Sequence, residues 1–315
     1  MHHTPSASPL LATIDLGSNS FRLEISRYIH SGSDKRTERL HYLKEIVRQG
    51  NGLDAHGNLT PEAMQRGWDC LARFGACLAQ FPSIRVRAIA TQTLREAHNR
   101  AVFLQRGTAL LGYPIEVLSG EQEARLVYQG VARQLPASDE RRLVLDIGGR
   151  STELIVGQHA NALVSTSLAV GSVAWSMRHF ADGSLSAAAF ALAVASAKTA
   201  LAPALPTYHH TAWDVAYGSC GTITAASDIL GAAGRSPDCI SRSDLEWLQT
   251  QLLQAKSTQS IHHALDKENR RPIIGGGISV LRAVYELLDI ERLHVIKGAL
   301  RQGVLCELLA HAATT

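Results

Sequence analysis

The sequence has few cysteines, few aromatic residues and no targeting signal. Its five cysteines are odd in number and form no C-x-x-C pair, which argues against a disulfide framework and a structural zinc site. No stretch approaches the roughly 20 apolar residues that span a bilayer, so we expect no membrane partner. Residues 1–9 have no basic flank leading into an apolar run, unlike a signal peptide. We therefore expect a reduced, cytoplasmic protein.

The sequence also lacks a strong charge of either sign. Its formal net charge is +3, and no basic stripe alternates with aromatic residues, so we expect no nucleic-acid partner. Any anion site must be local. The 315 residues, of which 45% are hydrophobic, are too many for one small core, so we expect two lobes with a cleft between them.

Short apolar strands alternate with helical patterns, which predicts an α/β fold that opens with a meander of three strands. The predicted strands are residues 10–17, 21–28, 39–48, 84–90, 115–118, 143–148, 152–156 and 162–170. The predicted helices are residues 61–81, 94–111 and 121–135, with a last helix at about 298–312. A polar segment at 134–142 is the predicted hinge.

One short segment occurs twice. Residues 13–23 superpose on residues 144–154, with Asp15 on Asp146, Gly17 on Gly148 and Ser20 on Ser151. The copies begin the two halves of the chain. We therefore expect a duplicated fold with an N-terminal lobe at 1–136 and a C-terminal lobe at 137–315.

Each copy consists of a strand, an Asp-x-Gly turn and a second strand. Glycine permits the tight reversal and lets backbone N–H groups face an anion, while Asp15 or Asp146 can hold a metal ion or its water. An ordinary hairpin with Asp and Gly as turn formers explains either copy alone. The pair favours two hairpins that hold phosphate and metal.

A third segment, residues 215–226, reads as a strand, a glycine-bracketed turn and a helix, which is the pattern of an anion site. It has no Walker lysine, and no arginine follows Cys220 at the spacing of a Cys-x5-Arg phosphatase. We therefore interpret Cys220 as a small loop residue. Residues 272–281 repeat the same pattern, and Gly275, Gly276 and Gly277 fit either a ligand loop or a tight strand-to-helix connection.

These motifs resemble the exopolyphosphatase and guanosine pentaphosphate phosphatase (Ppx/GppA) family, in the superfamily of acetate and sugar kinases, Hsp70 and actin. The resemblance spans most of the chain and implies an actin-like, ribonuclease H-like fold. The motifs that carry it are DLGSNSFR from Asp15, TLREA from Thr93, SGEQEARL from Ser119, DIGGRSTE from Asp146, GSCGT from Gly218 and GALRQGV from Gly298.

The resemblance implies a role for each matching residue. Glu123 would position and deprotonate the attacking water, with Glu121 as its neighbour and not the base. Asp146 and Glu153, with Asp15 as a further candidate, would hold Mg²⁺ or Mn²⁺. Arg22 and Arg95 would neutralise the transferred phosphoryl group. The expected phosphate-binding residues are Gly17, Ser18, Asn19, Ser20, Gly148, Gly149, Arg150, Ser151, Gly218, Ser219, Cys220, Gly221 and Thr222.

The sequence departs from the family pattern in two places. Arg150 stands where the family has a third glycine, and it either adds a phosphate contact or points outward. The chain ends at Thr315, as expected for a short form that lacks the C-terminal helical domains of longer members. The last helix should pack back toward the first lobe, and we expect a homodimer.

The leading functional hypothesis is exopolyphosphatase activity, the release of orthophosphate from the end of inorganic polyphosphate. The main alternative is hydrolysis of guanosine pentaphosphate to guanosine tetraphosphate by the same machinery. An ATP-dependent kinase fits the duplicated hairpins but not the motif from Ser119. A non-catalytic polyphosphate-binding protein conflicts with the joint presence of Glu123, Asp146 and Glu153.

Overall fold

The computed structural model describes residues 9–31, 34–261 and 270–313, so most of the tail at 1–9 lies outside the described residues. The chain forms two compact units. Unit 1 comprises Met1–Leu118 and Val304–Thr315, and unit 2 comprises Ser119–Gly303. Each unit has one mixed sheet with helices, which confirms the predicted α/β class in two parts. The division lies before α4 (Gly120–Ala132), whereas we predicted it after this helix, between residues 136 and 137.

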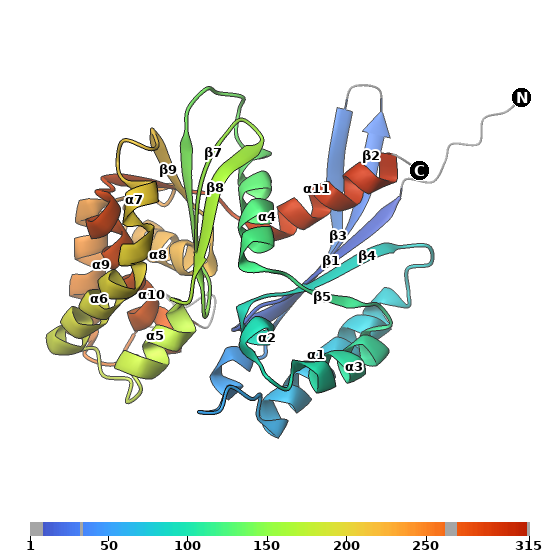
Figure 1. Ribbon diagram of the computed structural model, residues 1–315, viewed down its shortest axis with the longest axis horizontal. Helices are drawn as coiled ribbons and strands as arrows, with labels where there is room; N and C mark the ends of the chain where they lie inside the picture. The colour runs from blue at the N-terminus through green and yellow to red at the C-terminus, as the bar shows by residue number, and fades with distance from the viewer. Residues whose placement is uncertain (1–8, 32–33, 262–269, 314–315) are drawn as a thin grey trace, which may run out of the picture. The chain divides into compact units, whose positions relative to one another are not determined.

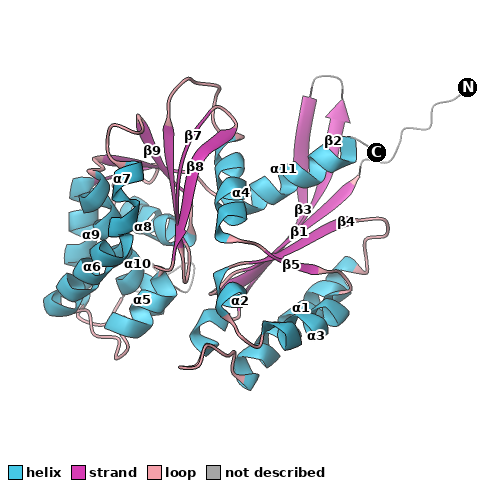
Figure 2. Cartoon of the chain, in the orientation of Figure 1, coloured by secondary structure: helices cyan, strands magenta, loops and turns pink. Residues whose placement is uncertain are grey.

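Unit 1 is built on a five-stranded sheet of order β3-β2-β1-β4-β5 (Figure 2). β1 pairs antiparallel with β2 and parallel with β4, and β5 is parallel to β4. The carboxyl ends of β1, β4 and β5 therefore lie at one edge. The strands are β1 (Leu10–Leu16), β2 (Ser20–Ser31), β3 (Asp34–Ile46), β4 (Arg85–Ala90) and β5 (Ile115–Val117).

The two faces of this sheet differ in polarity because side chains alternate along each strand. Ile14 and Leu16 are buried in the core that includes residues of α1 and α3, which cover this face in Figure 1. Asp15 points to the opposite face. The helices of unit 1 are η1 (Gln49–Gly52), α1 (Pro61–Leu78), α2 (Gln92–Glu96) and α3 (Arg100–Leu111). α11 (Ala299–Ala313) begins in unit 2 and belongs to unit 1 from Val304 on.

The single helix predicted at 94–111 is wrong, because the structure has two helices there. Ala97 is extended, with ψ of 117°, and ends α2. Asn99 precedes α3, and its side-chain amide both donates to the carbonyl of Leu59 and accepts from its N–H, each at 2.9 Å. The contact with a residue forty positions earlier in the chain interrupts a continuous helical pattern.

Unit 2 is built on a six-stranded sheet of order β10-β11-β9-β6-β7-β8. β6 pairs antiparallel with β7 and parallel with β9, so that β6 and β9 end at the same edge. The strands are β6 (Arg142–Ile147), β7 (Thr152–Gln158), β8 (Asn161–Leu168), β9 (Val215–Gly218), β10 (Cys239–Ser241) and β11 (Arg292–Val295). The remaining helices are α5 (Ser172–His179), α6 (Ala187–Leu201), η2 (Ala202–Ala204), α7 (Leu205–Tyr208), α8 (Gly221–Ala232), α9 (Arg242–Ala255) and α10 (Arg271–Leu288).

Both faces of the unit 2 sheet are covered. Leu143 and Leu145 belong to the large core that contains residues of α5, α6, α8, α9 and α10. Val144 and Ile155 point the other way and belong to a core cluster with Val127 of α4. Figure 1 shows α4 beside β7 and β8. Asp146 and Glu153 follow the same alternation, so they lie on the α4 face.

The prediction of a strand and a glycine turn at 272–281 is wrong, because these residues lie within α10. The three glycines are buried where other segments come close. A Cβ at Gly276 would lie 2.5 Å from Ser176 N and 2.6 Å from Ser172 O, so glycine allows α5 to pack against α10. A Cβ at Gly277 would lie 2.7 Å from Thr222 Cγ2. The glycines therefore serve helix packing, which removes the reason to interpret them as a ligand loop.

One apolar stretch was missed in the sequence. Ala187–Tyr208, which covers α6, η2 and α7, is 22 residues long and apolar enough by composition to cross a membrane. One such helix is weak evidence for a membrane span, since core helices pass the same test. Phe190, Ala197 and Tyr208 of this stretch are buried in the core of unit 2.

Candidate functional site

The repeated segment forms the same hairpin in each unit. A Cβ at Gly17 would lie 3.1 Å from the carbonyl oxygen of Ser20, and a Cβ at Gly148 would lie 3.1 Å from that of Ser151. Asp15 is the cross-strand partner of Arg22, and Asp146 is the cross-strand partner of Glu153. The predicted superposition thus holds in the backbone, while the residue opposite the aspartate changes from a cation to an anion.

In unit 1, two predicted site residues form an ion pair. Arg22 Nη1 lies 3.3 Å from Asp15 Oδ2, and the Asp15 side chain is 6% exposed. This pair joins a predicted phosphate-neutralising cation to a predicted metal ligand. A phosphate that binds Arg22 would compete with Asp15, so this geometry makes Asp15 a weaker candidate for metal binding than Asp146.

The turn of the first hairpin is held by two other segments of unit 1. The backbone N–H groups of Arg48 and Gly50 donate to the carbonyls of Asn19 and Ser18 at 2.9 and 2.7 Å. The hydroxyl of Thr93 donates to Ser18 Oγ at 2.7 Å. The Asn19 Nδ2 atom is buried with no hydrogen-bond partner among the described atoms. Ser18 accepts in both of its bonds, so they use neither its N–H nor its O–H donor. Asn19 has an amide donor to offer.

Arg95 lies at the edge where the parallel strands of unit 1 end. Its Nε donates to Gln92 Oε1 at 2.8 Å and its Nη1 donates to the carbonyl of Leu118 at 3.0 Å. Leu118 follows β5 and immediately precedes the cap of α4. Arg95 is therefore a cation held in place at the strand edge.

In unit 2, carboxylates and a hydroxyl form a row across three strands. Asp146 on β6 pairs with Glu153 on β7, and Glu153 pairs with Ser167 on β8. Ser167 Oγ donates to Glu153 Oε1 at 2.8 Å, and Glu153 is 1% exposed. Two acidic side chains side by side repel each other unless a cation or protons compensate them. Ser167 was not singled out in the sequence, because a serine on a strand carries no distinctive pattern.

α4 begins next to this row. Ser119 caps the helix in a capping box with Gln122, and a Cβ at Gly120 would lie 2.5 Å from Ser167 Cβ. Only glycine lets the helix start this close to β8. Glu123 lies one turn into α4 and is 7% exposed, next to Ala124 in the core shared with Val144 and Ile155.

Glu121 differs from Glu123 in its exposure to solvent. Its side chain is 71% exposed and lies 3.9 Å from Arg125 of the same helix. A contact of this kind on a helix surface contributes a few tenths of a kcal/mol. The structure therefore separates a surface carboxylate from a buried one, as the sequence interpretation of the Glu-Gln-Glu run requires.

The second hairpin is held by the start of α5. Ser172 N donates to the carbonyl of Gly148 at 2.9 Å, and Val173 N donates to that of Gly149 at 2.7 Å. A Cβ at Gly171 would lie 2.4 Å from Arg150 N, so the Arg150 backbone is closely packed. The N–H of Gly148 donates to the carbonyl of Ser151 at 2.8 Å. This N–H was predicted to bind phosphate, and its use within the turn excludes it from that role in this conformation.

The loop from Gly218 to Thr222 lies at the carboxyl end of β9, beside the end of β6. Ser219 N donates to the carbonyl of Leu145 at 2.9 Å, so this predicted phosphate donor is also used by the fold. The hydroxyl of Thr222 donates to the carbonyl of Ile147 at 3.4 Å. The predicted donors that remain, at Cys220, Gly221 and Thr222, stand at the first turn of α8.

Cys220 is a poor nucleophile in this setting. Its thiol accepts from the N–H of Ile223 at 3.3 Å and so caps α8. Burial, and after it the charge of Asp146, raises the pKa of the thiol to about 12. The thiolate is therefore scarce at neutral pH, which agrees with the interpretation of Cys220 as a loop residue.

The two carboxylates of unit 2 fit a magnesium ion. Mg²⁺ is commonly held by one or two carboxylates together with waters and substrate phosphates. Within the described ranges, no group of three or more His, Cys, Asp or Glu side chains is placed to hold a metal. Asp146 and Glu153 thus suit a magnesium site completed by phosphate oxygens better than a closed protein cage.

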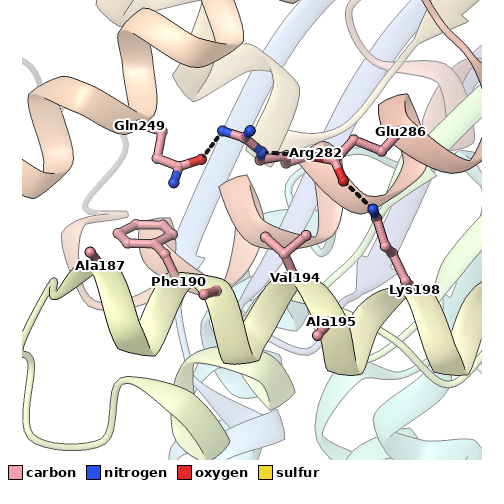
Figure 3. Close-up of a pocket in the computed structure, with 9 residues that line it drawn as sticks. Ala187, Phe190, Val194, Ala195, Lys198, Gln249, Arg282 and Glu286 are labelled. Carbon is pink, nitrogen blue, oxygen red and sulfur yellow. Dashed lines mark hydrogen bonds and ion pairs between the residues drawn. The ribbon is translucent and has the colours of Figure 1, made fainter.

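A pocket of about 330 Å³ lies elsewhere in unit 2, between α6, α9 and α10 (Figure 3). The α6 side of the pocket is mostly apolar and includes Phe190 and Lys198. Lys198 pairs with Glu286 of α10, which also pairs with Arg282 of the same helix. None of the predicted site residues lines it. The pocket is therefore separate from the candidate phosphate site.

Comparisons with known proteins identify relatives of this chain. The sequence model described as the Ppx/GppA phosphatase family matches residues 29–312. The guanosine-5'-triphosphate,3'-diphosphate pyrophosphatase of Vibrio vulnificus is 42% identical over 96% of this chain and 60% of its own length. That of Photobacterium profundum is 41% identical over the same shares. The chain thus spans about 60% of the length of these curated relatives.

Solved structures show the same fold. The crystal structure of an exopolyphosphatase from Cytophaga hutchinsonii superposes with a TM-score of 0.84 at 24% identity, covering 96% of this chain and 98% of that one. A Ppx/GppA family member from Aquifex aeolicus superposes with a TM-score of 0.76 at 24% identity, with the same coverage. The motifs, the match over residues 29–312 and the curated relatives lead to one conclusion: this chain belongs to the Ppx/GppA phosphatase family.

Proposed function

We propose that the chain hydrolyses the terminal phosphate of guanosine pentaphosphate, releasing orthophosphate and guanosine tetraphosphate, with a divalent metal ion. The observation that supports this most is the grouping in unit 2. The start of α4, which carries the buried Glu123, packs on Ser167, and Ser167 is bonded to Glu153 beside Asp146. A buried carboxylate beside a two-carboxylate cation site is what metal-assisted hydrolysis of an anhydride requires.

Glu123 acts on the attacking water in this proposal. The water oxygen forms a bond to the terminal phosphorus, and the anhydride P–O bond breaks with its electron pair leaving on the remaining phosphate chain. The proton lost by the water goes to the Glu123 carboxylate. A positioned base of this kind commonly contributes about 10² to 10⁴ in rate.

The other residues hold the phosphates. The first-turn N–H groups of α8 supply oriented donors, and Arg22 and Arg95 are the cations that the family resemblance implies for the transferred phosphoryl group. Asp146 and Glu153 would hold Mg²⁺ or Mn²⁺, which neutralises phosphate charge when bound. Phosphoryl transfer depends mainly on such positioning and charge neutralisation.

The choice of substrate reverses the order expected from the sequence. Curated relatives at 41% and 42% identity are guanosine-5'-triphosphate,3'-diphosphate pyrophosphatases, whereas the exopolyphosphatase structure is 24% identical and informs the fold alone. We therefore place guanosine pentaphosphate first and inorganic polyphosphate second. The expected homodimer, the cytoplasmic location and the lack of nucleic-acid or membrane partners stay predictions.

The proposal is tested by measuring orthophosphate release from guanosine pentaphosphate, inorganic polyphosphate and ATP at matched phosphate concentration. We expect the highest kcat/KM with guanosine pentaphosphate and the lowest with ATP. A clear preference for polyphosphate would return the second candidate to first place. Release from ATP alone would contradict both.

A further inference from the structure

The pocket between α6, α9 and α10 has an apolar side and a polar side that face each other (Figure 3). Its volume of about 330 Å³ falls within the range of roughly 300 to 1,000 Å³ that small-molecule sites occupy. α6 supplies the apolar side, which includes Phe190 and Val194, and Figure 3 shows Gln249 and Arg282 across from it. Such a pocket can hold the apolar body of a ligand on one side and its polar head on the other.

The polar side of the pocket presents hydrogen-bond donors that its own contacts hold in place. Arg282 Nε donates to Glu286 Oε1 at 2.8 Å, and Arg282 Nη1 donates to Gln249 Oε1. Arg282 Nη2 donates to none of the described residues. Because the Gln249 oxygen accepts from Arg282, the amide nitrogen of Gln249 is also left as a donor. The polar side therefore suits a ligand group that accepts hydrogen bonds.

The charges around the pocket leave one positive charge unmatched. Lys198 and Arg282 both pair with Glu286. Burial opposes the ionisation of Glu286, but hydrogen bonds from these two cations hold its pKa below the usual value, so the carboxylate is charged at neutral pH. Among the residues that line the pocket, two cations thus share one anion. A carboxylate supplied by a ligand would complete the pairing.

The apolar side of the pocket is a face of α6 that the core does not use. Phe190 and Ala193 are buried in the core of unit 2, whereas Ala191 and Ala195 are exposed and line the pocket. The short alanine side chains leave the space between the helices unfilled. An apolar group placed there would remove the surface of α6 from water, which favours binding.

We propose that this pocket binds a small organic carboxylate with an apolar body, such as a medium-chain aliphatic acid. The apolar body lies on α6. The carboxylate accepts hydrogen bonds from Arg282 Nη2, Lys198 Nζ and Gln249 Nε2, and bonds of this kind are strong because charged groups take part. The proposal does not depend on the phosphohydrolase function, because none of the candidate phosphate-site residues lines the pocket.

Octanoate is the probe that tests the proposal, with octanol as a control that lacks the charge and acetate as a control that lacks the apolar body. Binding to the unaltered chain is measured by saturation-transfer NMR titration, well below the micelle concentration of octanoate. We expect octanoate to bind with a Kd of about 1 mM or lower, and octanol and acetate to bind at least about fivefold more weakly.

Variants on the polar side separate a ligand contact from a structural role. Arg282→Gln should raise the octanoate Kd roughly 5- to 20-fold, because it removes a charge-assisted bond. Glu286→Gln should lower the Kd about twofold or more, because it removes a negative charge beside the carboxylate. Arg125 pairs with Glu121 of its own helix and does not line the pocket. Arg125→Gln is therefore the matched control and should keep the Kd within about twofold.

Two substitutions on α6 test the apolar side. Ala191 lines the pocket and Ala188 does not, and both are exposed on the same helix. Ala191→Asp should raise the octanoate Kd at least about 10-fold, since it places a charge where the apolar body lies. Ala188→Asp should leave the Kd within about twofold.

Failure of the unaltered chain to bind octanoate, or equally tight binding of octanol, would overturn the proposal. A native Kd in folded Arg282→Gln, or equal effects of Ala188→Asp and Ala191→Asp, would overturn it as well. If Arg282→Gln does not fold, Lys198→Gln takes its place: a Kd at least about threefold higher supports the proposal, and a native Kd contradicts it.

Discussion

At the scale of single residues, one position separates the two copies of the repeated hairpin. Opposite Asp15 stands Arg22, and opposite Asp146 stands Glu153. The first aspartate is neutralised within the protein, with 3.3 Å between Arg22 Nη1 and Asp15 Oδ2. The second stands beside another acid. A duplicated structure thus acquires one hairpin suited to phosphate and one suited to a cation.

This difference predicts unequal effects of two matched substitutions. Asp146→Asn should raise the Mg²⁺ concentration needed for half-maximal activity by roughly 10-fold or more, because it removes a proposed ligand. Asp15→Asn should leave that concentration within about threefold, because Asp15 is paired with Arg22. Activity is measured against Mg²⁺ for each variant. A larger shift for Asp15→Asn would contradict this prediction and favour a metal site at the first hairpin.

Cys220 offers a second test at the residue scale. With its pKa raised to about 12 by burial and by Asp146, the thiol stays protonated well above neutral pH. The unfolded chain should therefore react with iodoacetamide at pH 8 while Cys220 in the folded protein does not, as peptide mapping would show. Cys220→Ser keeps a capping group, so we expect turnover within about threefold of the unaltered chain. Loss of all activity in Cys220→Ser would instead support Cys220 as a nucleophile.

At the scale of secondary-structure elements, α4 is positioned by glycines at both ends. Gly120 allows it to start against Ser167, and a Cβ at Gly130 would lie 1.8 Å from the carbonyl oxygen of Ala299. A Cβ at Gly303 would in turn lie 2.0 Å from the carbonyl oxygen of Leu126. The start of α11 and α4 therefore cross with their backbones nearly touching, which fixes the helix that carries Glu123.

Gly130→Ala should consequently destabilise the fold, although alanine favours helices. Overpacking costs about 1 to 3 kcal/mol, which lowers the melting temperature by roughly 2 to 10 °C in a unit of this size. Gln129→Ala, one position earlier, is the control and should shift it by less than about 2 °C. Thermal unfolding followed by circular dichroism measures both. A stabilised Gly130→Ala protein would contradict the close crossing.

Elements with local signals could be predicted from the sequence, and those defined by distant contacts could not. The strands that carry Asp15 and Asp146 are short apolar runs, and Pro61 marks the start of α1. The glycines of α10 were interpreted as a turn. The α5 residues that pack closely against Gly276 lie about one hundred positions away, so the local sequence carried no sign of them. Ser167 carried no distinctive signal, since only the fold brings it to Glu153.

At the scale of the whole molecule, the proposed activity depends on a metal ion. Acidic side chains and a polyanionic substrate repel each other, so chelation with EDTA should abolish turnover and added Mg²⁺ or Mn²⁺ should restore it. The melting temperature should change little, because the candidate site has two carboxylates and not a closed cage. Full activity in chelator would refute the metal requirement.

The division into units changes which residues must act together. Glu123 was expected in the first lobe, yet α4 belongs to unit 2 with Asp146 and Glu153. The candidate base and the candidate metal ligands thus belong to one packed part of unit 2, in which α4 lies on β7 and β8. This arrangement explains why Glu123 is buried and Glu121 is exposed. Substitutions of these two acids can therefore be compared directly as a test of the proposed base.

Orthophosphate release by Glu123→Gln and Glu121→Gln is the measurement that tests this account most directly. Both variants and the unaltered chain are assayed on guanosine pentaphosphate with Mg²⁺, with guanosine tetraphosphate identified as the product and tripolyphosphate binding measured in parallel. We predict that Glu123→Gln loses roughly 10² to 10⁴ in kcat while tripolyphosphate binding is kept or strengthened, because one negative charge is removed. Glu121→Gln should keep its kcat within about threefold. Native turnover by Glu123→Gln, or loss of turnover in Glu121→Gln alone, would contradict the account.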